Sequence, residues 1–410
     1  MRSSFSPFFN SLNLISMRSF YLLFFSSILF FSCNSDGKSS EEVEGLKSIE
    51  IPELVKLDSI KVDFLGNPNV HDIHPEFKTI LFVHNYSMFS EDIHLADFEG
   101  LVFSSFSKTG DYPDTYSSLS STLRIVDDNS FLANGYNGFM TYNFDGRLIS
   151  KVKHINFQVP NYSPLLMGHG MEKMGDKYVY INQDSPKDND YSNKSRYDEM
   201  YLLDLLDPAT GEREGIIKFP ESSIFKSGKY FFRNAWDPVF HIENKKIHVA
   251  FGLEPVIYTF EASPPYEIES TLPIDLKGYN YFKGADEYSE DVSFFGLRFT
   301  SGMILNIKKF QNFFLVAYFP GYDQLDTQTN FENKSQDEAK DFRERMQKKY
   351  PSRIAIVDSS GNILNDFVPQ GLEPSSMLLR DGQLWMMEKA DEEVERDYFR
   401  LFRVALNAVK

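Results

Sequence analysis

Residues 123–152 read LRIVDDNSFLANGYNGFMTYNFDGRLISKV and contain the pattern that decides the fold. Apolar runs at 123–126, 131–133, 138–143 and 148–152 are separated by short turns rich in Asp, Asn and Gly. Runs of this length that contain aliphatic and aromatic residues and are bounded by turn residues predict β-strands. Because the turns are short, neighbouring strands must pair antiparallel. The segment therefore predicts a four-stranded β-meander.

The same order of strands recurs along the chain. One meander begins near Val70 and continues with runs at 79–83, 92–97 and 101–106. The others have runs at 178–181, 200–204 and 214–219, at 238–242, 246–251, 256–260 and 266–270, and at 303–307, 313–318, 353–357 and 363–367. The last meander has only three strands, at 376–379, 383–387 and 398–404, while residues 57–64 alternate with period two ahead of the first meander. We therefore expect the N-terminal strand to complete the last sheet.

Six such sheets predict an all-β chain, a six-bladed β-propeller of four-stranded antiparallel blades over residues 54–410, with one short helical insertion in blade 5. Radial packing buries the face of each sheet against its neighbour and leaves only short edges. Residues 54–410 provide roughly 60 residues per blade, more than the about 40 to 50 of common propeller repeats, so the surplus must form loops. A pair of β-sandwiches and a seven-bladed ring are the alternatives.

The meanders, their Asp-x-x-Gly-like turns and the N-terminal segment described next resemble the six-bladed β-propeller lipoproteins of Bacteroidota, including a family known only as a domain of unknown function. The resemblance covers residues 54–410. It implies the architecture, similar to TolB-like and NHL-like propellers, and it implies no particular activity.

The first 33 residues are predicted to be a lipoprotein signal peptide, and residues 34–53 a flexible tether. An apolar run at 20–31 follows Met17 and Arg18 and ends at Ser32 and Cys33, the only cysteine of the chain. The run is too short to span a membrane, and a small residue before a cysteine resembles a lipobox, in which that cysteine receives the lipid. Phe30 departs from the usual lipobox pattern. An ordinary secretory signal or a buried helix is the alternative, and either Met1 or Met17 begins the chain.

Composition excludes several classes of protein. The chain has 59 acidic and 42 basic side chains and a net charge of −17, which argues against nucleic-acid binding. One cysteine cannot form an intramolecular disulfide, so stability must come from buried apolar surface. The sequence has no nucleophile elbow, no phosphate-binding glycine loop and no dinucleotide-binding fingerprint, and we expect no cofactor.

The long connections all belong to one face of the predicted propeller. They span 107–120, 156–168, 184–198, 220–236, 273–300 and 320–352, whereas the turns of the other face are short. Functional residues concentrate on such loops. Aromatic side chains among carboxylates suit a glycan, a peptide or an envelope protein, and the candidate ligand-binding residues are Tyr112, Tyr116, Tyr162, Trp236, Tyr279, Tyr281 and Tyr322. Packing of these loops onto the blades is the alternative interpretation.

Residues 333–349 place Ala339, Phe342 and Met346 on one stripe and predict an amphipathic helix that ends before Pro351. The helix either covers the axial opening or docks a partner, or it packs on the edge of its blade.

Metal and catalytic sites have weak signals. His71 and His74 lie three apart on a predicted strand and face opposite sides unless the strand bends, so we expect no metal site there. Carboxylates at 184–190 lack the pattern of an EF-hand loop. The candidate catalytic residues are His169 and Asp237, at the entries to blades 3 and 4. The sequence thus predicts a lipid-anchored protein of the cell envelope, expected at the outer membrane, that binds a partner on its long-loop face. The alternative is a hydrolase or lyase that acts on a glycan or peptide at the axial mouth.

Overall fold

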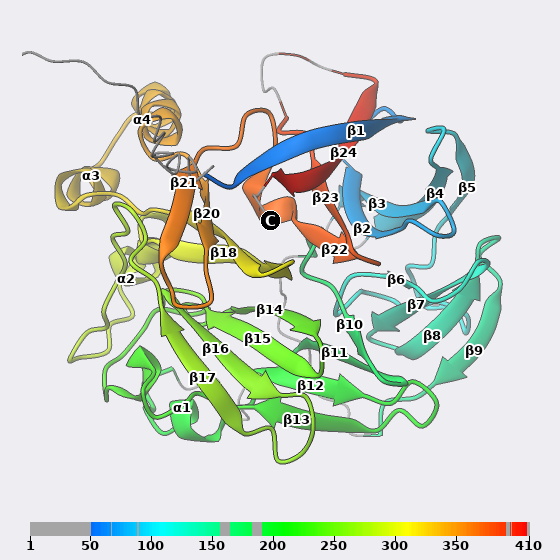
Figure 1. The fold of residues 1–410 in the computed structure, drawn as a ribbon, viewed down its shortest axis with the longest axis horizontal. Coiled ribbons are helices and arrows are strands. Elements are labelled where there is room, and N and C mark those ends of the chain that lie inside the picture. The colour runs from blue at the N-terminus through cyan, green and yellow to red at the C-terminus, as the bar shows by residue number, and fades with distance from the viewer. Residues whose placement is uncertain are drawn as a thin grey trace, which may run out of the picture. The chain divides into compact units, whose positions relative to one another are not determined.

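The computed structural model describes residues 51–66, 68–87, 90–155, 165–182, 191–390, 394 and 396–407, which belong to the compact unit 49–410. In this part of the chain, 24 strands form six four-stranded sheets arranged around a central axis (Figure 1). The predicted all-β, six-bladed propeller is confirmed. The predicted signal peptide, including Cys33, and residues 34–50 of the predicted tether lie outside the described residues.

Five blades follow the chain order from the innermost strand to the outermost. Blade 1 contains β2 (Pro68–His74), β3 (Thr79–Ser87), β4 (Ser90–Asp97) and β5 (Val102–Phe106). Blade 2 contains β6 (Arg124–Ile125), β7 (Ser130–Gly135), β8 (Gly138–Asn143) and β9 (Leu148–Val152). Blade 3 contains β10 (Glu172–Met174), β11 (Lys177–Ile181), β12 (Leu203–Leu206) and β13 (Arg213–Ile217). Blade 4 contains β14 (Pro238–Glu243), β15 (Lys246–Phe251), β16 (Val256–Glu261) and β17 (Ile268–Pro273). Blade 5 contains β18 (Met303–Phe310), β19 (Phe313–Phe319), β20 (Arg353–Val357) and β21 (Ile363–Phe367).

Blade 6 combines the two ends of the described chain. Its strands are β22 (Leu378–Arg380), β23 (Gln383–Met387), β24 (Tyr398–Asn407) and β1 (Glu53–Asp63), and β1 pairs antiparallel with β24. Ile60 and Val62 of β1 are buried. The predicted closure of the ring by the N-terminal strand is confirmed.

The turn at Gly100 in blade 1 is fitted against β1. Gly100 has a φ of 90°, which favours glycine, and its carbonyl accepts a hydrogen bond of 3.2 Å from the Asp63 amide. A Cβ atom at this position would lie 1.9 Å from the Lys61 carbonyl oxygen. Only glycine therefore lets this turn approach the closing strand so closely.

Blade 3 differs from the prediction in two respects. Its innermost strand, β10, is only three residues long and was not recognised. The third strand begins at Leu203 instead of residue 200, and its pairing with β13 contains an irregularity beside Leu203. Very short strands carry too little periodicity to be identified in a sequence.

Adjacent blades pack through apolar faces. Between blades 1 and 2, for example, one buried cluster includes Leu81, Leu95, Phe131, Met140 and Tyr142. Each such side chain stabilises the fold by about 1.5–3 kcal/mol relative to an exposed position.

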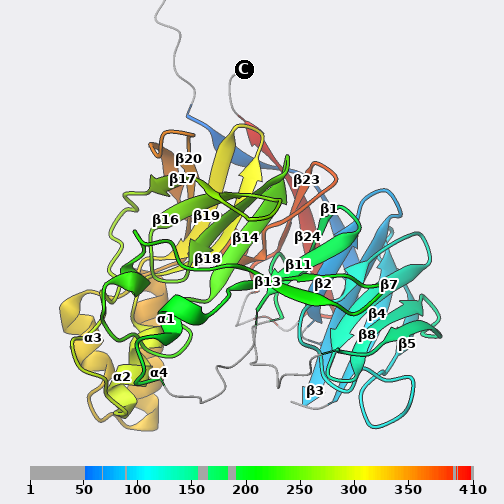
Figure 2. The ribbon, with the colours of Figure 1, turned by 90° about the horizontal axis from the view of Figure 1, so that it is seen from below.

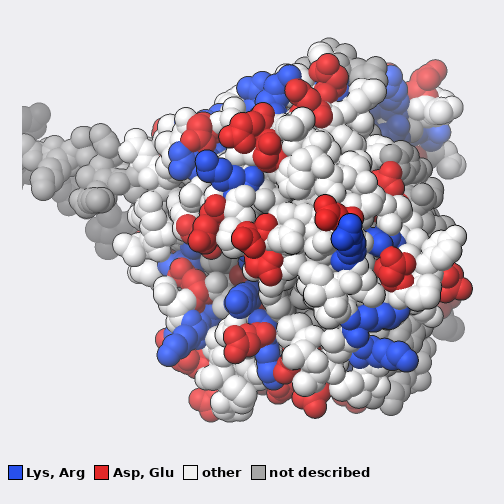
Figure 3. All heavy atoms as spheres, turned by 90° about the vertical axis from the view of Figure 1, so that its right-hand side faces the viewer, with Lys and Arg blue, Asp and Glu red and all other residues white. Residues whose placement is uncertain are grey.

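The helices gather on the long-loop face, as the side view shows (Figure 2). They are α1 (Arg196–Glu199), α2 (Val292–Gly296), α3 (Gln324–Asn330) and α4 (Gln336–Lys349), with short 3₁₀ turns η1 (Ile224–Lys226), η2 (Leu297–Phe299) and η3 (Pro374–Ser376). On the side of the molecule formed largely by blades 1 and 2, acidic and basic side chains are interspersed (Figure 3).

Helix α4 is the predicted amphipathic helix, and it begins three residues later than expected. Ser335 and Glu338 form a capping box at its start, and Phe342 and Met346 are buried. In Figure 1, α3 and α4 lie away from the axis on the side of blade 5, and in Figure 2 they lie with α2 at the long-loop face. The helix therefore does not cover the axial opening, and its buried Phe342 contacts the ring of Tyr322 in the preceding loop.

Candidate functional sites

The structure separates the seven predicted ligand-binding residues. Tyr112 is 70% exposed on the loop between blades 1 and 2, whereas Tyr116 and Trp236 are buried. The Tyr116 hydroxyl donates a 2.7 Å hydrogen bond to Glu91 inside the protein. Tyr162 lies outside the described residues. The remaining three, Tyr279, Tyr281 and Tyr322, line one groove.

This loop-face groove is formed by the loop between blades 4 and 5, by Tyr322 and by helix α3. Its volume is about 530 Å³, and its lining residues are Tyr279, Asn280, Tyr281, Phe282, Lys283, Leu297, Thr300, Ser301, Tyr322, Gln324, Thr327 and Gln328. Three tyrosine rings and the ring of Phe282 thus meet amide and hydroxyl side chains in one place. The sequence placed carboxylates among the aromatic residues of these loops, but none of the described residues that line the groove is a carboxylate.

Internal contacts fix two of the three tyrosines. The Tyr279 hydroxyl donates a 3.0 Å hydrogen bond to the Leu253 carbonyl, and the Tyr322 ring stacks on Tyr350 with centroids 4.9 Å apart. The Tyr281 ring lies 5.3 Å from that of Tyr279 and is partly exposed. Burial raises the pKa of Tyr279 well above its usual value, and it also raises the pKa of Tyr281. Replacing Tyr281 would therefore change the surface of the groove and would leave the hydrogen bond between Tyr279 and Leu253 in place.

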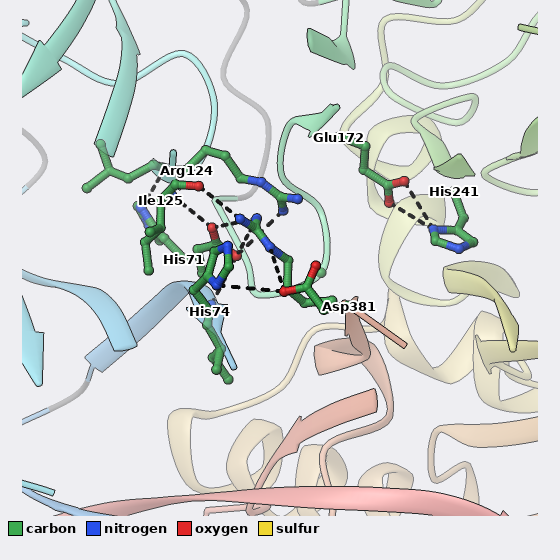
Figure 4. Close-up of polar contacts among 12 residues, drawn as sticks. His71, His74, Arg124, Ile125, Glu172, His241 and Asp381 are labelled. Atoms are coloured by element: carbon green, nitrogen blue, oxygen red, sulfur yellow. Dashed lines mark hydrogen bonds and ion pairs between the residues drawn. The ribbon is translucent and has the colours of Figure 1, made fainter. Parts of the chain in front are cut away.

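A second site lies on the axis at the opposite face, where the innermost strands end in short turns. This axial pocket has a volume of about 300 Å³. Its lining residues are His74, Arg124, Ile125, Val126, Glu172, Lys173, Tyr178, His241, Ile242, Leu379, Arg380 and Asp381, which come from blades 1, 2, 3, 4 and 6. Its polar side chains form two groups (Figure 4).

The first group surrounds Asp72, which is completely buried at a bulge in β2. Its carboxylate accepts hydrogen bonds from the Ile73 amide at 3.0 Å, the Ile125 amide at 2.9 Å and the Arg380 guanidinium at 3.0 Å. Arg380 also donates to the Ile125 carbonyl at 2.9 Å. Two charged side chains therefore join the inner strands of blades 1, 2 and 6.

The second group is centred on Glu172 of blade 3. Its carboxylate lies 3.1 Å from His241 Nδ1 and accepts a 2.6 Å hydrogen bond from the Ile242 amide. Lys308 Nζ of blade 5 is 3.8 Å from Glu172 and donates to the Gly168 carbonyl at 3.0 Å. Burial alone would raise the pKa of Glu172, but His241, Lys308 and the amide outweigh it and lower the pKa to about 2.

The two histidines of the His71-Asp72-Ile73-His74 segment have structural contacts. His71 Nδ1 accepts a hydrogen bond from the Leu123 amide at 3.1 Å, and burial lowers the His71 pKa to about 3. His74 stacks on Phe77 with centroids 4.0 Å apart and lies 3.7 Å from Asp381. Among the described residues, no three His, Cys, Asp or Glu side chains are placed to hold a metal ion.

The two candidate catalytic residues are not paired by any interaction of the described residues. His169 is located beside the axis near Lys308; burial, followed by the Lys308 charge, lowers its pKa to about 4. Asp237 accepts a 3.1 Å hydrogen bond from Asn234, and the positive charges of Arg298 and Arg233 act to lower its pKa. Burial raises the Asp237 pKa to about 7.

Replacing Asp237 with asparagine is expected to stabilise the protein at neutral pH. Burial raises the folded-state pKa from 3.8 to about 7. Between these values the unfolded chain releases a proton that the folded chain retains, so the free energy of unfolding falls as the pH rises. Asparagine removes this loss. Because Asp237 is only partly buried by surface area, we expect a gain of about 1–3 kcal/mol at pH 7.5 and little change at pH 4.

Urea unfolding at both pH values measures this difference. The substitution Asp286→Asn, at an exposed position of the same face, is the matched control. An equal gain from Asp237→Asn at pH 4 and pH 7.5 would contradict a titrating Asp237.

Sequence reasoning missed the axial pocket altogether. Asp72 and Arg380 are 308 positions apart, and the five innermost strands that reach the pocket contribute only one or two lining residues each. The segment at His71 was noticed for its histidines, but the aspartate between them is the residue that joins the blades. A buried ion pair between the first and last blades of a ring leaves no local sequence pattern by which it could be recognised.

The described part of the chain contains no helix long and apolar enough to cross a membrane.

Neither a family model nor a curated protein matches the sequence. Among solved structures, a member of the DUF4221 family from Bacteroides vulgatus is 13% identical, with a TM-score of 0.58 over 88% of this chain and 100% of that chain. A candidate exported protein from Bacteroides fragilis is 10% identical, with a TM-score of 0.48 over 89% of this chain and 98% of that chain. The likeness to the Bacteroides vulgatus protein confirms, at the level of the fold, the resemblance to six-bladed propellers of Bacteroidota.

Proposed function

We propose that this chain is a lipid-anchored protein of the cell envelope that binds a glycan in the loop-face groove. The observation that carries the proposal is the convergence of Tyr279, Tyr281 and Tyr322, from two separate loops, on one groove. Aromatic rings offer rigid, amphipathic surface to the apolar face of a sugar ring. The amides of Asn280 and Gln324 can both donate and accept hydrogen bonds, as sugar hydroxyls require.

The size of the groove supports a short glycan. Its volume of about 530 Å³ lies within the range of about 300–1,000 Å³ for small-molecule sites. A peptide or an envelope protein is the competing partner, and binding of either one in place of a glycan would refute the proposal.

The anchor is the part of the proposal that rests on sequence. The apolar run at 20–31 and Ser32-Cys33 support lipid attachment at Cys33. The outer membrane is the expected location. Mass spectrometry of the N-terminal fragment tests this attachment separately from glycan binding.

The alternative function, a hydrolase or lyase, depends on His169 and Asp237. None of the described interactions joins these two side chains, and they have different neighbours. No observation favours turnover over binding, so binding is the function proposed.

Replacing Tyr281 with alanine is expected to weaken glycan binding at least about tenfold. Removal of one aromatic platform costs about 1.4 kcal/mol or more in buried aromatic contact, which corresponds to a factor of ten or more in affinity. A glycan array identifies the ligand, and isothermal titration calorimetry compares the variants. Tyr281→Phe, which keeps the ring, should bind within about threefold of the parent.

Tyr112→Ala is the matched control, because Tyr112 is exposed on a loop of the same face outside the groove. Binding of a peptide instead of any glycan, or equal affinity of the Tyr281→Ala variant, would refute the proposal.

A further inference from the structure

The axial pocket and the loop-face groove are separate sites. The innermost strands begin at the long-loop face and end at the short-turn face, and the pocket residues His74, Ile125 and Arg380 are the last residues of β2, β6 and β22. The residues of the loop-face groove instead come from connections at the beginning of inner strands and from α3. A ligand in one site therefore does not touch the other.

Basic side chains gather at this pocket although the whole chain carries a net charge of −17. Arg124, Lys173 and Arg380 line it, and Lys308 lies behind Glu172. The acidic lining residues are Glu172 and Asp381. Burial of so many charges is costly, and such clusters in a concave site are candidates for function.

Most of these charges are already used by the fold. The Arg380 guanidinium is bonded to Asp72 and to the Ile125 carbonyl, at 3.0 and 2.9 Å. The Glu172 carboxylate is occupied by His241, the Ile242 amide and Lys308. The Arg380 guanidinium therefore has only some of its N–H donors left for a ligand, and the Glu172 carboxylate has only some of its acceptor positions left.

Arg124 differs from them. Within the described residues its guanidinium makes one ion pair, 3.5 Å from Asp72, and no hydrogen bond, and its side chain is 15% exposed. In Figure 4 the side chain extends from its strand toward the side on which Glu172 and His241 lie. A guanidinium has five N–H donors in a rigid fork, which matches the two oxygens of a carboxylate.

Tyr178 supplies a second unused group. Its side chain is almost fully buried against the pocket, and among the described interactions its hydroxyl has no hydrogen-bond partner. Asp381, which is half-exposed at the rim, is an acceptor for a ligand hydroxyl. The lining of the pocket thus offers donors to an oxyanion, and its rim offers an acceptor.

We propose that the axial pocket binds a small hydroxy carboxylate, with the carboxylate on the Arg124 guanidinium and the Tyr178 hydroxyl and a ligand hydroxyl donating to Asp381. The volume of about 300 Å³ is at the lower limit for small-molecule sites and suits one sugar-sized molecule. This site goes beyond the proposed glycan-binding function and does not depend on it.

The test uses the full-length chain in mild detergent at fixed ionic strength. Isothermal titration calorimetry with glucuronate, gluconate and lactate is compared with neutral glucose and with inorganic phosphate. We expect at least one hydroxy carboxylate to bind and glucose and phosphate to bind at least about tenfold more weakly. Failure of all three carboxylates, or equal binding of glucose or phosphate, would overturn the proposal.

Variants then locate the site. Arg124→Gln is expected to weaken the bound carboxylate at least about tenfold, because a charge-assisted hydrogen bond is lost. Arg147→Gln makes the same charge change at an exposed turn of the same blade and should have no effect. Arg124→Lys keeps the positive charge but lacks the planar fork of N–H donors, so it should bind the carboxylate with intermediate affinity. This variant provides the test if the Arg124→Gln protein does not fold.

Tyr281→Ala, in the loop-face groove, should leave carboxylate binding unchanged. Equal affinity of the parent and the Arg124→Lys and Arg124→Gln proteins would place the ligand elsewhere and refute the assignment.

Discussion

Replacing Asp72 with alanine is expected to lower the free energy of unfolding by about 3–5 kcal/mol. Asp72 is completely buried, and its carboxylate accepts bonds from Arg380 and from the Ile73 and Ile125 amides. Alanine would leave a buried guanidinium without its anion and two amides without their acceptor. The loss therefore exceeds the value of the ion pair itself, because the unsatisfied partners stay buried. Urea unfolding monitored by tryptophan fluorescence measures it.

Two further variants separate this explanation from a general sensitivity of blade 1 to mutation. Asp128→Ala, at an exposed turn of blade 2, should change the free energy of unfolding by less than about 0.5 kcal/mol. The double substitution Asp72→Leu with Arg380→Met removes both charges and should recover at least half of the loss. A double variant that is no more stable than Asp72→Ala would show that the buried charges do not set the cost.

Most of the fold could be predicted from the sequence because each blade repeats the same order of short strands and turns. Short apolar runs alternate with turns such as Asp145-Gly146, and this signal is local. The closing strand was found for the same reason, since residues 57–64 alternate with period two and the last meander lacked a strand. Helix α4 was found through the spacing of Phe342 and Met346, which are buried.

The missed elements lack such local signals. Strand β10 has three residues, too few for a period. Helix α3 has the sequence QLDTQTN, without an apolar stripe, and it is held by the Asp323 side chain, which caps its first turn by accepting a bond from the Asp326 amide. Its position depends on tertiary contacts such as the Lys349 ion pairs with Asp323 and Asp326, at 3.0 and 2.6 Å.

The candidate sites also differ in whether the sequence carries a local signal for them. Three tyrosines of the long loops do share a groove, but composition could not distinguish them from Tyr116 and Trp236, which point into the core. The axial pocket could not be predicted because its lining residues come from five blades, and partners such as Glu172 and His241 are 69 positions apart in the sequence. Only ring closure brings Arg380 to Asp72.

Removal of residues 1–65, which deletes β1, is expected to abolish cooperative unfolding of the propeller. Strand β1 pairs with β24 along its length, from Glu53 opposite Asn407 to Asp63 opposite Tyr398. Without it, β24 becomes an exposed edge, and an open edge invites pairing with other chains. The buried surface of Ile60 and Val62 would also be lost, at about 1.5–3 kcal/mol for each side chain.

The comparison that isolates this strand is a chain that begins at residue 50, which keeps β1 and should unfold at the same temperature as the full-length protein. Differential scanning calorimetry and size-exclusion chromatography should show one sharp transition and one monodisperse species for that chain, and a broad transition with aggregates for the chain lacking 1–65. Because the Asp58 carboxylate pairs with Arg403 across the β1–β24 ladder, with Nε 3.1 Å away, a synthetic peptide of residues 51–65 should partly restore the sharp transition. An unchanged midpoint without β1 would mean that the five complete blades and the remaining three strands hold the ring closed, and that face-to-face packing between blades outweighs the closing strand.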